Sequence, residues 1–293
     1  NELLINPDAK NSLDYLKNRK LSLDTIKRFK LGYVKKNSNF FENLEKKFSK
    51  KGVKDSGIFY FDEKRNSFVD RFRDRIIFPI NSISGFPIAI GGRIMQKNSF
   101  FAKYINSPET QFFKKGNNLY NIEKARKLSN SVEQIFLVEG YMDVISLNNQ
   151  GIENCVANLG TALTENQISI LNQFFNEIVI CFDGDESGYK AAVRAAENSI
   201  KELKPEKQIS FLFLPQDEDP DTFIVKNGKQ KFIKYYEMNK IFIHQFLFEN
   251  LKKQSNNSPT SLAILEKKLR YLANTIKDQY IKKYILDFFL GKI

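Results

Sequence analysis

Acidic side chains gather at three points in the middle third of this 293-residue chain, each just after a short apolar run. The three groups are Glu139 with Asp143, Asp183 with Asp185, and Asp219 with Asp221. Carboxylates held close together repel one another unless cations lie between them, and ligand sets made only of oxygen suit hard ions such as Mg²⁺ or Mn²⁺. In a strongly basic chain, such groups indicate metal-assisted phosphate chemistry on a polyanion.

The elements that must position these acids are predicted from the apolar runs around them. Strands are expected near 134–139, 154–158, 178–183 and 209–214, with helices near 141–149, 164–175 and 188–203. This alternation predicts a parallel sheet with helices on its faces. Functional groups collect beyond the carboxyl ends of such strands, so the acidic groups should meet there. Five carboxylates, all those above except Asp143, suffice to hold two divalent ions.

The charge is unevenly distributed along the chain, whose net charge is +12. Residues 1–130 carry 27 Lys and Arg against 13 Asp and Glu, and residues 223–293 carry 14 against 5. Residues 131–222 carry only 5 against 16, so an acidic block lies between two basic ones. Basic blocks are the electrostatic footprint of nucleic-acid binding, and the alternative is a lysine-rich, solvated surface.

Several function classes are disfavoured by the rare residue types. Cys155 and Cys181 lie within apolar runs and are expected to be buried strand residues, which suits a reducing cytoplasm. His244 lies among apolar residues of helical type, so a Ser/His or Cys/His hydrolase is not expected. The apolar runs are much too short for a membrane span. The chain begins at Asn1 without Met, and we interpret it as an excised fragment.

The expected fold class combines α+β and α/β architecture in three subdomains. Residues 1–130 should form a basic, mixed α+β subdomain, residues 131–222 the metal-binding parallel-sheet subdomain, and residues 223–293 a helical subdomain. In the first, Ser22 is a predicted helix N-cap. A strand is expected over 68–80, and its period of two would place Arg71, Arg73 and Arg75 on one face. A turn at 81–85 and a return strand over 86–95 should follow.

The acidic motifs resemble the Toprim module, and more narrowly that of bacterial DnaG-type primases. The matching segments are Val138–Asp143, Phe182–Gly188 and Glu218–Thr222. The Toprim pattern alone is shared with topoisomerases, recombination proteins and some nucleases. Further segments resemble the basic core of these primases: Asp70–Ile80, Gly91–Arg93, Lys103–Thr110, Phe113–Gly116 and Leu119–Tyr120.

This resemblance implies roles for individual residues. The metal-binding acids would be Glu139, Asp183, Asp185, Asp219 and Asp221, of which Glu139, Asp183 and Asp185 would be catalytic. Glu139 would be the general acid/base, and Asp143 is a further carboxylate of the motif. A groove between two subdomains would hold template, primer or nucleotide phosphates through Arg71, Arg73, Arg93, Lys103, Asn106 and Lys115.

The resemblance also implies cofactors and partners. Mg²⁺ or Mn²⁺ would serve the reaction, with a single-stranded DNA template, ribonucleoside triphosphates and an RNA primer product. The family's zinc-binding domain needs Cys and His ligands that this sequence lacks, so zinc is expected only in that missing domain. Contact with the replicative helicase would pass through another missing domain, and single-strand-binding protein is a further partner. The expected location is the bacterial cytoplasm, at the replication fork, with no membrane partner.

Four alternatives to a primase core remain open at this point. A Toprim nuclease would use the same acids, but the Arg-Phe-Arg and Lys-Tyr-Ile-Asn-Ser-Pro segments match primases. A topoisomerase needs an active-site Tyr, and nothing marks one. A phosphatase with an aspartyl nucleophile, suggested by Asp183 and Asp185, leaves Glu139 without a role. A non-enzymatic module that binds single strands does not need the intact acidic set.

Overall fold

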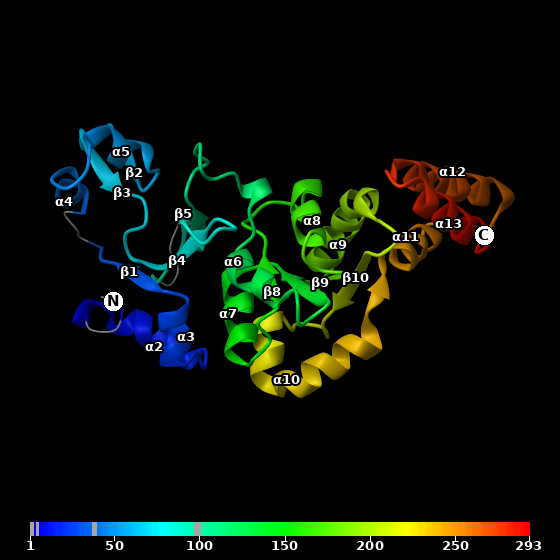
Figure 1. Cartoon of the computed structure of the whole chain (residues 1–293), viewed down its shortest axis with the longest axis horizontal. Helices are drawn as coiled ribbons and strands as arrows, with labels where there is room; N and C mark the ends of the chain where they lie inside the picture. The colour runs from blue at the N-terminus through cyan, green and yellow to red at the C-terminus, as the bar shows by residue number, and fades with distance from the viewer. Residues whose placement is uncertain (1–2, 4–5, 37–39, 97–100) are drawn as a thin grey trace. The chain divides into compact units, whose positions relative to one another are not determined.

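The computed structural model describes residues 3, 6–36, 40–96 and 101–293. These form two compact units, Asn1–Glu123 and Lys124–Ile293 (Figure 1). In the described residues, no helix is both long enough and apolar enough to cross a membrane. The expected combination of α+β and α/β architecture, with a parallel sheet and a helical C-terminal region, is confirmed.

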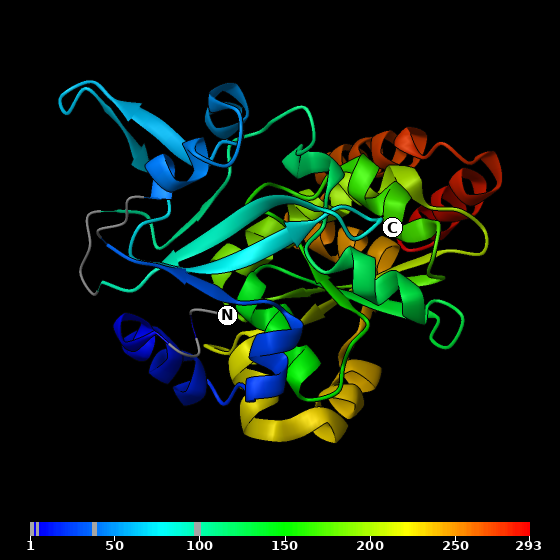
Figure 2. The same ribbon diagram turned by 60° about the vertical axis from the view of Figure 1, so that its left-hand side comes forward.

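The first unit contains an antiparallel sheet with the strand order β1-β4-β5-β6. Its strands are β1 (Gly32–Val34), β4 (Arg75–Asn81), β5 (Pro87–Ile94) and β6 (Tyr104–Asn106). Figure 2 shows β4 and β5 as a long pair in cyan, and the predicted turn between them has Gly85 at φ 91°. A separate hairpin joins β2 (Phe59–Asp62) to β3 (Ser67–Asp70).

Short helices flank these strands. They are η1 (Pro7–Ala9), α2 (Lys10–Asn18), α3 (Leu23–Arg28), α4 (Phe40–Glu45), α5 (Lys50–Asp55), η2 (Lys115–Asn117) and, at the boundary, α6 (Ile122–Ala125). Ser22 caps α3 as predicted, because its Oγ accepts a hydrogen bond from the Thr25 N–H at 3.1 Å. Ile26 and Phe29 are buried, as the helical spacing requires. The unit therefore has an apolar core of its own.

The expected continuous strand over 68–80 is wrong. It is interrupted by a turn at residues 71–74, where Asp74 adopts a φ of 55°. The Phe72 ring is fully buried, and the Asp70 carboxylate accepts a hydrogen bond from the Phe72 N–H at 2.8 Å. Burial of this ring and the local carboxylate contact stabilise a turn where alternation alone predicts a strand. The three arginines therefore do not share one strand face.

The second unit is built on a five-stranded sheet with the order β11-β10-β9-β7-β8. Its strands are β7 (Gln134–Val138), β8 (Cys155–Ala157), β9 (Glu177–Phe182), β10 (Gln208–Phe213) and β11 (Ile241–Phe242). The first four pair in parallel and lie within one residue of the expected positions, whereas β11 is antiparallel to β10. Cys155 and Cys181 are buried in strands, as expected, and their thiols are not joined in a disulfide.

Helices cover both faces of this sheet. On one face, α7 (Tyr141–Asn149) packs against α10 (Pro220–Asn239), and on the other lie α8 (Glu165–Asn172) and α9 (Glu186–Ser199) (Figure 1). The short helices η3 (Arg126–Leu128) and η4 (Ile200–Glu202) complete this part. The strands are buried on both sides, which explains their nearly continuous apolar sequences.

The C-terminal region is helical, as expected, apart from the two-residue strand β11. Its helices are α11 (Ile243–Lys252), α12 (Pro259–Thr275) and α13 (Gln279–Leu290). The His244 ring lies 5.9 Å from that of Phe242 and 4.7 Å from that of Phe288, between centroids. Burial lowers the pKa of His244, so this side chain is a neutral packing element.

Candidate active site

The acidic residues lie beyond the carboxyl ends of three parallel strands. Glu139 directly follows β7, Asp183 directly follows β9, and Asp219 lies on the loop between β10 and α10. The strands β7 and β9 are neighbours, but the helices that follow them, α7 and α9, cover opposite faces of the sheet. This arrangement is the topological switch point at which open parallel sheets bind ligands.

The pKa of Asp183 reports on its neighbours in this acidic group. Desolvation raises the pKa of Asp183 to about 7, and the nearby charges of Glu139, Asp219 and Asp185 add to the effect. Four acids from three separate segments of the chain are therefore close enough to repel one another. This is the meeting of acidic groups that the strand pattern predicted.

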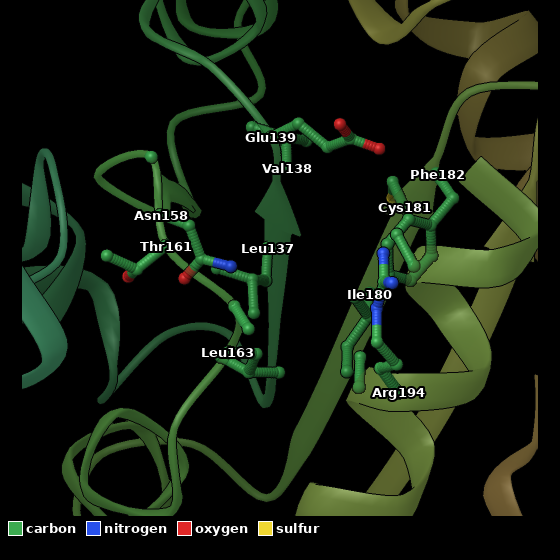
Figure 3. A pocket seen from close by; sticks show the side chains of 14 residues that line it. Leu137, Val138, Glu139, Asn158, Thr161, Leu163, Ile180, Cys181, Phe182 and Arg194 are labelled. Atoms are coloured by element: carbon green, nitrogen blue, oxygen red, sulfur yellow. The ribbon is translucent and has the colours of Figure 1, made fainter. Parts of the chain in front are cut away.

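Glu139 lies at the same edge of the sheet (Figure 3). Partial desolvation of its carboxyl group raises its pKa, and the charge of Asp185 acts in the same direction. A hydrogen bond with the Asp183 backbone opposes this shift. A carboxyl group with a raised pKa exchanges protons more readily near neutral pH than an ordinary glutamate does.

Asp143 supports the turn after β7. It is only 9% exposed, and its Oδ2 accepts a hydrogen bond from the Gly140 N–H at 2.9 Å. Burial raises its pKa well above the usual range, and the charges of Asp219, Asp183 and Asp221 raise it further. Asp143 therefore holds the start of α7 and belongs to the same electrostatic group.

Asp185 and Asp219 each cap a helix. The Gly188 N–H donates to Asp185 Oδ1 at 2.6 Å at the start of α9, and the Thr222 N–H donates to Asp219 Oδ1 at 2.6 Å at the start of α10. No described residue donates a hydrogen bond to the second carboxylate oxygen of either side chain. Capping thus fixes the orientation of both carboxylates while one oxygen stays available to a ligand.

The turn between Asp183 and Asp185 requires glycine. A Cβ atom on Gly184 would lie 2.1 Å from the carbonyl oxygen of Pro215, which is far below contact distance. The Gly184 N–H also donates to the Glu218 carbonyl at 3.2 Å. Close approach of these two backbone segments brings the loop after β9 next to the loop after β10.

Asp221 is held from another helix. It is 1% exposed, and its Oδ1 accepts a hydrogen bond from Ser146 Oγ of α7 at 2.6 Å. A buried carboxylate without such a donor would carry a desolvation penalty of about 1–3 kcal/mol or more. Ser146 therefore fixes Asp221 and ties α10 to α7.

The donor chemistry of this acidic group fits a divalent metal ion. All of its side-chain ligand atoms are carboxylate oxygens. Desolvation and the neighbouring carboxylates raise the pKa of Asp183, and a cation would offset both effects. Within the described part of the chain, no three or more His, Cys, Asp or Glu side chains already form a finished ligand cage. The acids are gathered and oriented, but their oxygens do not yet converge on one point.

Arg71 and Arg73 of the first unit line one hollow of about 230 Å³, together with Lys36. Arg71 Nε donates to the Gly57 carbonyl at 3.2 Å, and Arg73 Nη1 donates to Tyr60 Oη at 3.3 Å. Both arginines are half-buried. The turn at 71–74 therefore brings these two side chains together, although they do not share a strand face.

Arg75 differs from these two arginines. It is 4% exposed, and its Nη1 donates to the carbonyls of Gly92, Ala102 and Lys103 at 3.4, 3.0 and 3.3 Å. Burial lowers its pKa, against the opposing charge of Asp74. Its contacts tie together neighbouring parts of the first unit's sheet, which is a structural task.

The other basic and polar residues lie on the same sheet and its connections. Arg93 of β5 lies over the Tyr15 ring, 4.0 Å from its centroid. Lys103 is exposed just before β6, and Asn106 ends that strand opposite Gly91. Lys115 is the first residue of η2. The first unit thus carries all six predicted phosphate contacts, and the second carries the acids.

Two residues near the acids were missed by sequence reasoning. Ser146, the donor to Asp221, lies 75 positions away in sequence, and no local signal pairs them. Arg194 lines a hollow that includes Glu139 (Figure 3). A signal for Arg194 was available, because it is the only arginine among residues 131–222.

Comparisons with known proteins agree with this geometry. Residues 1–126 match the family model described as the DNA primase catalytic core, N-terminal domain, and residues 136–224 match a Toprim-like model. A DNA primase of Pseudomonas putida is 38% identical over 258 residues, covering 87% of this chain and 38% of that protein. The chain thus spans less than half the length of this relative.

Solved structures match over nearly the whole chain. A DNA primase domain from Pseudomonas aeruginosa is 34% identical, with a TM-score of 0.92 over 99% of this chain and 92% of that one. A DnaG primase catalytic domain bound to single-stranded DNA is 33% identical, with a TM-score of 0.90 and coverage of 99% and 92%. Both units are therefore shared with these structures.

Proposed function

The chain belongs to the family of DnaG-type primase catalytic cores, and we propose that it synthesises short RNA primers on single-stranded DNA. The observation that carries this proposal is the gathering of Glu139, Asp183 and Asp219 at the switch point of a Toprim-like sheet. In the proposed reaction, the 3′-hydroxyl oxygen of one ribonucleotide bonds to the α-phosphorus of the next. The bond from that phosphorus to the leaving pyrophosphate breaks.

The proposed metal ligands are Glu139, Asp183, Asp185, Asp219 and Asp221, and the proposed ion is Mg²⁺ or Mn²⁺. When bound, such an ion supplies charge neutralisation to the triphosphate and polarises its phosphorus–oxygen bonds. Proton transfer is assigned to Glu139, whose raised pKa suits acceptance of the 3′-hydroxyl proton. The caps at Asp185 and Asp219 keep both carboxylates oriented before any ligand arrives.

The proposed phosphate contacts are Arg71, Arg73, Arg93, Lys103, Asn106 and Lys115 of the first unit. Guanidinium groups bind phosphates through paired N–H donors, and lysines act as mobile point charges. Arg71 and Arg73 retain further N–H donors beyond those used in their contacts with Gly57 and Tyr60. These residues would hold template, primer or incoming nucleotide phosphates and so position the reacting groups.

The nuclease alternative loses its support. It accounts for the Toprim-like segment at 136–224, which nucleases share, but not for the match of residues 1–126 to the N-terminal domain of the primase catalytic core. A structure of the same fold, with 33% identity, is described as bound to single-stranded DNA. That description concerns the relative, and it supports a single-stranded template for this chain.

The wider setting is proposed from family membership. The replicative helicase and single-strand-binding protein are proposed partners, and the bacterial cytoplasm at the replication fork is the proposed location. We also propose that the second unit divides functionally near residue 222, between a metal-binding part from 131 and a helical part to 293. This proposed boundary lies in the first turn of α10.

The experiment is a primer-synthesis assay with single-stranded DNA, labelled ribonucleoside triphosphates and Mg²⁺ or Mn²⁺. The parent chain should make short RNA, and Asp183→Asn should lose at least about a hundredfold in rate, as expected for loss of a charge-stabilising group. Asp217→Asn removes an exposed carboxylate from the loop between β10 and α10 and should retain activity. Equal synthesis by Asp183→Asn would refute the metal assignment. Shortening of the DNA template, without RNA synthesis, would support the alternative hypothesis that the chain is a nuclease.

A further inference from the structure

The basic C-terminal block has no part in the proposed phosphate contacts, which all lie in the first unit. Residues 259–293, which hold α12 and α13, carry seven Lys and Arg against three Asp and Glu. The two helices pack on each other and on α11 (Figure 1). The side chains that they bury are apolar, among them Leu265, Leu269 and Leu272 of α12 and Phe289 of α13. The opposite side of each helix faces solvent.

Three tyrosines lie on these outward faces. Tyr271, Tyr280 and Tyr284 are 70%, 72% and 67% exposed, whereas none of the other nine tyrosines is more than 36% exposed. Tyr280 and Tyr284 are one turn apart, so both rings lie on one side of α13. Rings that are this exposed contribute little to the core, and tyrosine is a preferred contact group for binding partners.

Lysines without an ion-pair partner lie beside these rings. Lys267 is one turn before Tyr271 on α12, so the two side chains share a face. On α13, Lys283 Nζ lies 5.8 Å from the centroid of the Tyr284 ring. No described residue forms an ion pair with Lys267 or Lys283, whereas Arg270 of α12 has a carboxylate oxygen at 2.7 Å. Each outward face therefore combines exposed rings with a positive charge that the protein does not neutralise.

This combination favours a nucleic acid over a protein as the partner. Lysine is depleted at the centres of protein–protein interfaces, where tyrosine is enriched. A second copy of this chain would bring two positive faces together. A single strand of nucleic acid offers phosphates to the lysines and flat bases to the rings, and stacking on aromatic side chains binds such strands without sequence preference. In a duplex, the faces of the bases are already stacked on one another.

We propose that the outward faces of α12 and α13 form a contact site for single-stranded DNA. Bases would stack on Tyr271, Tyr280 and Tyr284, and phosphates would bind Lys267 and Lys283. The choice of DNA rests on the proposed function, because the RNA product is paired with its template, whereas the template beyond the product is unpaired. The site lies wholly within the second unit, contains none of the clustered acids and needs no metal ion.

The chain has no tryptophan, which permits a local test of base stacking. Tyr284→Trp places the only indole of the chain on α13, and its emission should be quenched by oligo-dT in EDTA, because bases stack on the ring. Met238→Trp is the matched control, since Met238 is 73% exposed on α10 of the same unit, and its emission should not change. Duplex DNA should quench neither variant. Absence of quenching in Tyr284→Trp, or equal quenching in Met238→Trp, would overturn the inference.

Affinities for labelled oligo-dT, measured by fluorescence anisotropy in EDTA, separate the rings from the charges. Tyr280→Ala with Tyr284→Ala should bind at least about tenfold more weakly than the parent, and the corresponding double Phe variant should bind as the parent does, because it keeps both rings. Lys267→Gln with Lys283→Gln should lower the slope of log affinity against log salt by about 1.4, for two lost phosphate contacts. Lys234→Gln with Met238→Ala, on the exposed side of α10, is the control and should change neither quantity.

The remaining outcomes are equally decisive. All the substituted side chains are exposed, so the variants should keep the circular dichroism of the parent. Parent-like affinity of the double Ala variant, or an unchanged salt slope of the double Gln variant, would overturn the inference. Self-association of the parent that the double Ala variant abolishes would assign this face to a second copy of the chain instead. RNA synthesis by the parent chain, and its loss in Asp183→Asn, are measured separately and test only the proposed function.

Discussion

The charge on Asp183 should make the metal-free protein less stable as the pH rises. Its pKa is raised from 3.8 to about 7 in the folded chain, so the folded state favours the protonated form over this interval. The group's stabilising effect is complete below about pH 4 and is lost as the pH rises through about 7. The rise of the Asp183 pKa from 3.8 to about 7 corresponds to an upper bound of about 4 kcal/mol in folding free energy. Asp183 is half-exposed, and solvent screening reduces this to about 1–2 kcal/mol.

Asp183→Asn removes this pH-dependent cost. Relative to the parent chain, its free energy of unfolding in EDTA should therefore increase by about 1–2 kcal/mol between pH 4.5 and pH 8. Urea titrations followed by circular dichroism measure this difference. Asp217→Asn is the matched control, because Asp217 is exposed and its φ of 64° suits asparagine equally well. Added Mg²⁺ should stabilise the parent chain at pH 8 more than it stabilises Asp183→Asn. Identical pH dependence of the parent chain and Asp183→Asn would refute the assignment of a raised pKa to Asp183.

Three further predictions test the groups that position the site. Ser146→Ala should lower the free energy of unfolding by about 1–3 kcal/mol, because the hydrogen bond from Ser146 Oγ to the buried Asp221 carboxylate is lost. Urea denaturation beside the exposed control Ser169→Ala measures this, and equal stability would contradict it. Gly184→Ala should lower the free energy of unfolding by about 1–3 kcal/mol and abolish RNA synthesis, since the new Cβ would lie 2.1 Å from the carbonyl oxygen of Pro215. An unchanged melting temperature with unchanged synthesis would show that the turn can relax. Lys103→Gln should weaken binding of single-stranded DNA and lower the slope of log affinity against log salt by about 0.7, which fluorescence anisotropy measures; an unchanged slope would remove Lys103 from the phosphate contacts.

The parallel sheet was predictable from sequence because its signals are local. Each buried strand is a short apolar run, and each is followed by residues that begin a turn or cap a helix. Asp185 and Asp219 mark helix starts as well as strand ends, so two independent local rules agree at these positions. Agreement between such rules explains why the expected parallel strands lie within one residue of the observed ones.

The errors arose where distant contacts override local pattern. The alternation of apolar and polar residues over 68–80 fits one continuous strand and also fits two strands separated by a turn. Burial of the Phe72 ring favours the two strands with a turn. The bond from Ser146 to Asp221 joins two helices that are far apart in sequence. The strand β11 has only two residues and exists through pairing with β10, so no periodicity marks it. In all three cases, contacts between residues far apart in the sequence determine the local structure.

The acidic group is stable without ions because the fold supports most of its members separately. Asp185 and Asp219 accept backbone hydrogen bonds at helix starts, Asp143 accepts one from Gly140, and Asp221 accepts one from Ser146. No described residue donates a hydrogen bond to the Asp183 carboxylate, so neither its desolvation nor the repulsion from Glu139, Asp219 and Asp185 is offset by such a bond. A cation would relieve Asp183 without replacing any of the other four contacts. Because three other acids of the group act on Asp183, its substitution changes the electrostatics of all of them.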